Sequence, residues 1–256
     1  MVIKAYTLAK PNEPNRQSED RYWINTDVTD LETAPQYPRL IIALSDGAGG
    51  VGLFAGEWAQ YLIDQAKIRW QHEVIQGYKE LENWLGSIWE PFFLDMLANP
   101  SLTESQRYKF EKQGACATLL LLWQVGPTSF VIYTVGDTCM HQYRGHDTLF
   151  VTPIQYENPN KFAEPPYLIS LLDPLEPQGP VKNNFELKPG QKALFATDAL
   201  SEYIIQGFYH AKTATEGQSK PFEQLQSQEE FEALIHLNLA SNQLRSDDYT
   251  LITLTA

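Results

Sequence analysis

Four short acidic segments, each at the end of an apolar run, limit what this chain can fold into. The first contains Asp46, the second Asp137, the third Asp198 and the fourth Asp247. Apolar runs that stop at turn residues are typical of buried strands, so these carboxylates are expected at strand ends. Carboxylates in such places, with a glycine that lets a backbone carbonyl join them, suit hard cations such as Mg²⁺ or Mn²⁺. The sequence therefore suggests a metal-dependent hydrolase.

Length and charge narrow the possible classes further. The chain has 256 residues, enough to bury a large core, and we expect a single domain over residues 1–256. Its formal net charge of −13 disfavours a nucleic-acid backbone or an anionic membrane surface as a partner, since binding either relies on clustered Lys and Arg. Part of the acidity is expected to be neutralised by bound cations.

Cysteine and histidine give no sign of a zinc site. Cys116 and Cys139 lie inside apolar stretches without metal-ligand spacing, so they are interpreted as small buried residues, which fits a reducing compartment. The five histidines also show no ligand spacing and are interpreted as structural or exposed. Residues 1–6 lack the long apolar segment of a signal peptide, and no later run has the length of a membrane span. We expect a monomeric, cytoplasmic protein.

The spacing of apolar residues predicts an alternation of strands and helices. Helices are expected to begin within residues 50–57, to follow the apolar stripe of residues 81–96, where Pro91 should kink or interrupt the helix, and to cover residues 200–206 and 228–239. A hairpin at Gly126-Pro127 should begin a meander that the strands after residue 137 extend. The proline-rich residues 153–190 are interpreted as a surface excursion near the site. Strands are predicted at residues 22–25, 40–44, 115–123, 130–135, 138–143, 148–152, 193–196 and 249–254.

The order of the short motifs resembles that of a known family, the metal-dependent serine/threonine protein phosphatases of the 2C type, and its bacterial members in particular. Each motif alone is a weak signal, but in this order, over nearly the whole chain, they form a fairly specific signature. The motifs are Glu19-Asp20, Asp46-Gly47-Ala48-Gly49-Gly50, Gly114-Ala115-Cys116-Ala117-Thr118, Gly136-Asp137-Thr138, Thr197-Asp198-Ala199-Leu200 and Asp247-Asp248-Tyr249-Thr250.

The resemblance implies a fold of the α+β class, a four-layer α/β/β/α sandwich of two antiparallel β-sheets flanked by helices. It places a binuclear Mn²⁺ or Mg²⁺ centre, with a possible third ion, in a cleft at one end of the sandwich. Residues 153–190 occupy the place of the family's flap, which lies beside the active site and affects substrate choice.

The same resemblance implies a ligand set. Asp46 would bridge the two metal ions, and the carbonyl of Gly47 would bind the second. Asp198 and Asp247 would complete the first metal ion, and Asp137 would hold a third, weaker one together with Asp198.

A further implication concerns water and substrate. Glu19 and Asp20 would orient metal-bound water. The family usually has an arginine four residues before that glutamate to grip the substrate phosphate. Here Asn15 stands at that position, and the nearest arginine is Arg16, which becomes the tentative phosphate-binding residue. Ala48 stands where some members carry a histidine proposed as general acid.

Phosphomonoester hydrolysis by such a centre is physically reasonable. Two cations lower the pKa of a bridging water and clamp the phosphoryl oxygens, so no side-chain nucleophile is required. This agrees with the lack of a P-loop glycine-lysine motif in the sequence. The sequence therefore predicts hydrolysis of phosphoserine or phosphothreonine on a protein.

Structural alternatives stay open beside each functional reading. The Asp46 segment can be a strand-to-helix turn, and Asp198 can be a helix N-cap. Asp137 and Asp247 can be turn residues, Glu19-Asp20 can be solvated charge, and Arg16 can be a surface side chain. At the level of function, the alternative is a catalytically impaired relative that acts as a regulatory or interaction module. A third class is a small-molecule phosphohydrolase without a protein substrate.

Overall fold

The most apolar runs of the sequence form the central strands of a β-sheet. In the computed structural model, which describes residues 1–11, 13, 17–25, 36–144, 148–213 and 221–256, strand β3 (Arg39–Ser45) is buried from its second residue onward. Strand β5 (Leu119–Gln124) is buried throughout. A strand that is apolar along its whole length is covered on both faces, and these two strands lie side by side in the sheet.

The described residues form two compact units, each of which contains one large sheet. The terminal unit comprises Met1–Ser18, Asp137–Pro166 and Glu186–Ala256, and the central unit comprises Glu19–Gly136 and Tyr167–Phe185. Two antiparallel sheets carrying helices confirm the expected α+β fold class. The single domain expected from the sequence stays a prediction.

The central unit is built on a five-stranded sheet in the described part of the chain, with the strand order β10-β6-β5-β3-β2. The pairs β2–β3, β3–β5 and β5–β6 are antiparallel. A second, two-stranded sheet pairs β4 with β9. The remaining bounds are β2 (Arg21–Ile24), β4 (Cys116–Ala117), β6 (Ser129–Val135), β9 (Ile169–Ser170) and β10 (Pro180–Glu186).

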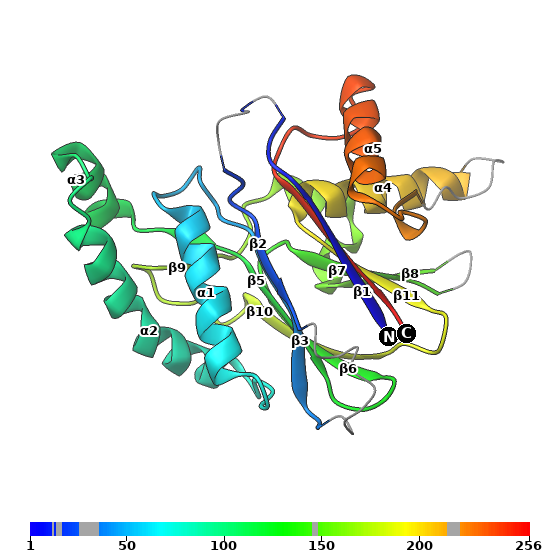
Figure 1. The fold of residues 1–256 in the computed structure, drawn as a ribbon, viewed down its shortest axis with the longest axis horizontal. Coiled ribbons are helices and arrows are strands. Elements are labelled where there is room, and N and C mark those ends of the chain that lie inside the picture. The colour runs from blue at the N-terminus through cyan, green and yellow to red at the C-terminus, as the bar shows by residue number, and fades with distance from the viewer. Residues whose placement is uncertain (12, 14–16, 26–35, 145–147, 214–220) are drawn as a thin grey trace. The chain divides into compact units, whose positions relative to one another are not determined.

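Three helices belong to the central unit: α1 (Ala55–Arg69), α2 (Tyr78–Ala98) and α3 (Glu104–Gln113). Helix α1 packs on strands β2 and β3, and α2 packs on α1 through rings such as those of Trp58 and Phe92, whose centroids are 5.0 Å apart (Figure 1). The predicted interruption at Pro91 is wrong, because α2 runs through it. Pro91 lies on the exposed side of the helix, while the apolar stripe on the other side is held by packing.

Helix α3 was not predicted from the sequence. Its apolar pattern is weak, because only Phe110 is buried, but its start carries a clear local signal. Thr103 and Gln106 form a capping box, in which each side chain binds the other residue's backbone N–H.

The terminal unit has a five-stranded sheet in its described part, with the order β1-β12-β11-β7-β8. Strand β1 was also missed by the sequence reasoning. It pairs with β12 from Val2↔Thr255 to Leu8↔Tyr249, so the two chain ends lie side by side (Figure 1). The bounds are β1 (Val2–Leu8), β7 (Cys139–Tyr143), β8 (Leu149–Thr152), β11 (Lys192–Ala196) and β12 (Tyr249–Thr255).

Two longer helices cover the terminal sheet. Helix α4 (Asp198–Thr213) packs on β7 and β12, and α5 (Gln228–Ala240) packs beside β1. The rings of Tyr6 and Phe231 stack with centroids 5.7 Å apart, which fixes α5 on this sheet. Both helices begin within two residues of their predicted starts.

The expected meander is corrected by the structure. Strands β7 and β8 do form a hairpin, but they belong to the terminal sheet, whereas β5 and β6 belong to the central one. The chain leaves the central sheet at Gly136, which has a φ of 102°. A Cβ at Gly136 would lie 2.6 Å from Thr118 Cγ2, so only glycine permits this change of direction.

Residues 153–190 are only partly a surface excursion. They contain strands β9 and β10 and two 3₁₀ helices, Ile154–Glu157 and Pro159–Ala163. Tyr156, Phe162 and Ile169 are buried. This segment therefore contributes to both hydrophobic cores instead of lying wholly outside them.

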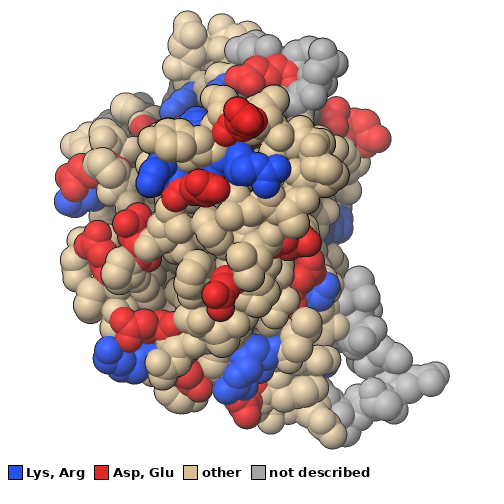
Figure 2. All heavy atoms as spheres, turned by 90° about the vertical axis from the view of Figure 1, so that its left-hand side faces the viewer, with Lys and Arg blue, Asp and Glu red and all other residues tan. Residues whose placement is uncertain are grey.

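Charged side chains on the surface drawn in Figure 2 are mixed in sign. The helices of the central unit carry local pairs of opposite charge, for example Lys67 with Asp64 at 3.1 Å and Lys79 with Glu82 at 2.8 Å. None of the described helices combines the length and the hydrophobicity that a membrane span requires.

Candidate active site

In the central unit, the loop after strand β3 carries Asp46 and is held by backbone geometry. The Asp46 N–H donates to Thr118 Oγ1 at 2.9 Å, and the Thr118 N–H donates to the Asp46 carbonyl at 2.9 Å. The Ala48 N–H donates to the Cys116 carbonyl at 2.9 Å. The loop is thus clamped against strand β4, and the half-buried Asp46 is presented at the end of a fully buried strand.

Glycines allow this loop to approach its neighbours closely. A Cβ at Gly47 would lie 2.6 Å from the carbonyl carbon of Ala55, at the start of α1, so no other residue fits there without a backbone shift. A Cβ at Gly49 would overlap the carboxylate of Glu19. The sequence pattern Asp-Gly-Ala-Gly-Gly therefore has a steric reason at Gly47, where the obstacle is backbone, whereas at Gly49 the obstacle is the end of the Glu19 side chain.

The segment before β2 lies against the same loop. Glu19 borders Gly49, and its Cα would lie 3.3 Å from a Cβ at Gly56. Asp20 is buried, and its backbone carbonyl accepts a hydrogen bond of 2.8 Å from Arg21 Nη1. The structure therefore brings Glu19 to the Asp46 loop, as the motif order implied. Its proposed effect on water stays a prediction, and Arg16 lies outside the described residues.

In the terminal unit, three aspartates form one electrostatic group. Asp137 follows Gly136, Asp198 begins helix α4, and Asp247 precedes β12. Burial and the nearby Asp198 carboxylate raise the pKa of Asp137 to about 7, and Asp247 contributes further. Burial and Asp198 also raise the pKa of Asp247. Such raised pKa values mean that burial and neighbouring negative charge disfavour the ionised carboxylates. A nearby cation would stabilise the ionised forms.

The turn that carries Asp247 is fixed by Tyr249. The Tyr249 hydroxyl donates to the carbonyl of Arg245 at 2.6 Å and accepts from the Asp247 N–H at 3.2 Å. Asp248, in turn, accepts from the Lys10 N–H at 2.8 Å, so it joins β12 to the segment after β1. Of the two adjacent aspartates, Asp248 therefore has a structural partner in the segment after β1.

Sequence reasoning missed Arg245, which lies in the middle of the acidic group. Its Nη2 donates to Asp198 Oδ2, its Nε lies 3.5 Å from Asp247 Oδ2, and its Nη1 lies 3.8 Å from Glu202 Oε2. The only sequence signal was its position two residues before Asp247. The guanidinium is the cation that these carboxylates face in the structure.

The donor chemistry fits Mn²⁺ or Mg²⁺, since every proposed ligand in the two units is a carboxylate or carbonyl oxygen. Within the part of the chain that the structure describes, however, no three His, Cys, Asp or Glu side chains form a group able to hold a metal ion. Asp198 and Asp247 both contact the guanidinium of Arg245. Asp198 Oδ1 also accepts from the N–H of the adjacent Ala199 at 2.5 Å.

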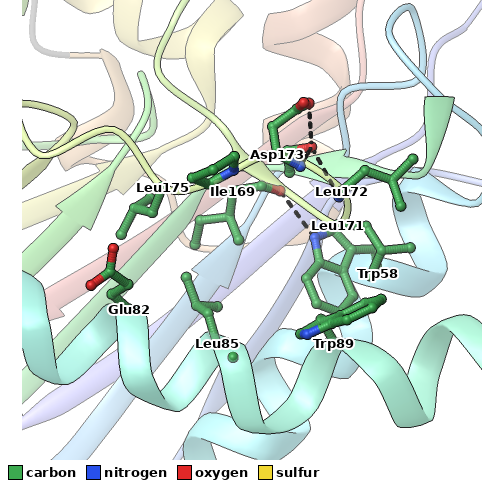
Figure 3. Close-up of a pocket in the computed structure, with 12 residues that line it drawn as sticks. Trp58, Glu82, Leu85, Trp89, Ile169, Leu171, Leu172, Asp173 and Leu175 are labelled. Carbon is green, nitrogen blue, oxygen red and sulfur yellow. Dashed lines mark hydrogen bonds between the residues drawn. The ribbon is translucent and has the colours of Figure 1, made fainter. Parts of the chain in front are cut away.

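A separate cavity of about 360 Å³ lies in the central unit between helix α2 and the segment around β9 (Figure 3). The Trp58 indole N–H donates to the Ile169 carbonyl at its edge, at 3.0 Å. Most of its described lining is apolar, including Leu85 and Trp89. Such walls suit neither a metal ion nor a phosphate.

The structure of the chain was compared with known proteins. No protein-family model matches the sequence, and no curated protein matches it. Solved structures do match. The catalytic domain of the serine/threonine protein phosphatase PstP, in complex with two manganese ions, has 17% identity and a TM-score of 0.59, and the match covers 98% of this chain and 96% of that chain.

Two further structures give the same result. Serine/threonine phosphatase Stp1 from Staphylococcus aureus has 17% identity and a TM-score of 0.58 over 99% of this chain and 94% of its own. The Mycobacterium tuberculosis phosphatase PstP/Ppp has 16% identity and a TM-score of 0.58 over 98% and 97%. The family resemblance of the sequence motifs is thus confirmed in the fold: the chain has the fold of serine/threonine protein phosphatases of this type.

Proposed function

We propose that this protein is a metal-dependent serine/threonine protein phosphatase. The observation that carries the proposal is the gathering of the buried Asp137 and the partly buried Asp198 and Asp247 into one acidic group, in a chain with the fold of such phosphatases. Turn residues and helix caps alone give no reason for Asp198 to raise the pKa of both Asp137 and Asp247.

The proposed ligands are those that the family resemblance implies. They are Asp46, the Gly47 carbonyl, Asp137, Asp198 and Asp247. When bound, two Mn²⁺ or Mg²⁺ ions, with a third more weakly held, would supply an activated water and neutralise the phosphoryl oxygens. A PstP structure that contains two manganese ions supports this choice of metal.

The chain's own residues have separate tasks in this proposal. The backbone clamp on residues 46–48 keeps the Asp46 carboxylate at the strand end, so little conformational entropy is lost when a ligand binds. Glu19, which borders Gly49, would accept a proton or hydrogen bond from the attacking water. Arg16 is the proposed phosphate-binding side chain. Phosphoserine and phosphothreonine proteins are the proposed substrates, and the monomeric state and cytoplasmic location stay predictions.

One observation favours a second candidate function. Because Arg245 is ion-paired with Asp198 and Asp247, the chain could instead be a phosphatase-like regulatory module whose acidic group is neutralised internally. In that case the protein would fold and bind partners without catalysing hydrolysis.

The deciding experiment uses metal-stripped full-length protein titrated with Mn²⁺ and Mg²⁺. Phosphate release is measured from p-nitrophenyl phosphate and from a phosphothreonine peptide. Asp46→Asn removes a proposed ligand, and Asp64→Asn is the matched control, because Asp64 pairs with Lys67 on the surface of α1. Metal-dependent turnover that is lost only in Asp46→Asn supports the phosphatase. No turnover by folded protein at millimolar metal supports the regulatory module.

A further inference from the structure

Arg245 makes contacts that compete directly with metal binding. Its guanidinium meets Asp198 and Asp247, the two carboxylates proposed to complete one metal ion, and both side chains are partly buried, with 21% and 39% of their side-chain surface exposed. A carboxylate oxygen that donates its lone pair to a metal ion cannot keep the same geometry toward a guanidinium. The two cations also repel each other at such distances. Arg245 and a divalent cation are therefore alternative partners of the same side chains.

The structure also contains a place to which the displaced side chain can move. Arg245 and Glu202 line a pocket of about 300 Å³ together with residues of α4 and of the turn after α5. Glu202 is already 3.8 Å from Arg245 Nη1. The Arg245 backbone is anchored by the Tyr249 hydroxyl, so the exchange needs only a side-chain movement. Tyr203 and Gln206 supply further polar groups along this pocket.

We infer that Arg245 is the internal counter-ion of the metal-free site and that a divalent cation binds by displacing it from Asp198 and Asp247 toward Glu202. The inference rests on the proposed function, because it takes these aspartates as ligands. Arg245 then acts as a positioning residue that lowers the affinity of the site for metal. It also keeps the acidic group neutralised when no metal is bound.

Metal binding itself, measured without substrate, tests this exchange. Mn²⁺ affinity is determined on metal-stripped full-length protein by calorimetry and by the electron paramagnetic resonance signal of free Mn²⁺. Arg245→Gln should tighten Mn²⁺ binding by about tenfold, because a competing positive charge has been removed. Arg144→Gln is the matched control. It removes the same charge in the same unit, from an arginine that contacts Gln142 and the Phe150 ring.

A second variant distinguishes competition between Arg245 and Mn²⁺ from a general effect of charge on Mn²⁺ binding. Glu202→Gln removes the side chain toward which Arg245 retreats, so it should weaken Mn²⁺ binding. If the two residues work as a pair, this weakening should largely disappear when Arg245→Gln is also present. Should Arg245→Gln fail to fold, Arg245→Lys replaces it. Lysine cannot bridge several carboxylates as a planar guanidinium does, so it should tighten binding in the same direction by a smaller factor.

The outcomes distinguish the two proposals. If Arg245→Gln binds Mn²⁺ no more tightly than Arg144→Gln, or binds it more weakly, the displacement is refuted while the phosphatase proposal stands. If folded wild-type protein and Arg245→Gln both fail to bind Mn²⁺ at millimolar concentration, the proposed function fails and this inference fails with it.

Discussion

The acidic loop of the central unit and the acidic group of the terminal unit are held by different forces. Asp46 is placed by backbone hydrogen bonds and by a glycine that no larger residue can replace. The terminal aspartates come from three separate segments, and two of them, Asp198 and Asp247, pair with the charge of Arg245. The central loop is thus defined by shape and the terminal acidic group by charge. The difference predicts that the two regions respond differently to mutation, pH and metal.

The largest expected effect is on catalysis, through Asp198. Asp198→Asn should lower metal-dependent phosphate release by about 1,000-fold, the equivalent of about 4 kcal/mol in the barrier. The free energy of unfolding should change by less than about 1 kcal/mol, because the Asp198–Arg245 pair is partly exposed. Kinetics and urea denaturation measure the two quantities. Glu164→Gln, which removes a surface partner of Lys161, is the control. A large loss of stability in Asp198→Asn would contradict a group held by charge.

In the central loop, the main effect of a substitution should be a lower free energy of unfolding. Gly47→Ala forces a Cβ to within 2.6 Å of the Ala55 carbonyl carbon, so it should destabilise the protein by about 3 kcal/mol. Gly50→Ala is the matched control, because a Cβ there meets no described atom within 4 Å and φ is not in the left-handed region. Urea denaturation of both variants gives the answer. Equal stability of the two would show that the loop is not defined by shape.

A third difference concerns the stability of the folded protein at low pH. His141, in the terminal sheet, is fully buried, and burial lowers its pKa to about 3 from the ordinary 6.5. The unfolded chain therefore binds a proton more readily than the folded chain between these values. The stability that the neutral imidazole contributes is complete above about pH 6.5 and is lost as the pH falls toward 3.

This loss should amount to about 2 kcal/mol between pH 7 and pH 5. His141→Gln, which can keep a hydrogen bond to Ser201, should remove this part of the pH dependence. His72→Gln, at an exposed position in the central unit, should leave it unchanged. Denaturant titrations at several pH values measure the slopes, and identical slopes for both variants would rule out His141 as the source.

The smallest effect compares two helix caps. Thr103→Ala removes the hydroxyl of the α3 capping box in the central unit, which accepts from the Gln106 N–H and donates to Gln106 Oε1, and should cost about 1 kcal/mol. Ser227→Ala removes a cap on α5 in the terminal unit, where Ser227 Oγ accepts from the Glu230 N–H at 3.2 Å, and should cost slightly less. Thermal melting of both variants ranks them. A clearly larger loss for Ser227→Ala would contradict this ranking.

Much of the fold followed from local patterns. The run that became β3 is almost entirely apolar and was predicted within one residue at each end, and α1 begins inside the predicted stretch of residues 50–57. The single strand predicted at residues 115–123 is wrong, because the chain forms two strands there, β4 and β5, which belong to different sheets. Strand β1 was missed, because its residues are mostly half-buried and its identity depends on pairing with β12 at the other end of the chain. The change of sheet at Gly136 was missed for a similar reason. It depends on contact with Thr118, which no local pattern reveals.

The sequence alone determined where the carboxylates lie along the chain, because turn residues after apolar runs are a local signal that needs no partner. It also determined that Gly47 and Gly49 belong to the Asp46 loop. Only the tertiary structure decided that the Asp198 carboxylate raises the pKa of Asp137, and that Arg245 contacts Asp198. The physical reason is that charge interactions depend on distance in space, and these segments approach one another only when the terminal sheet has formed.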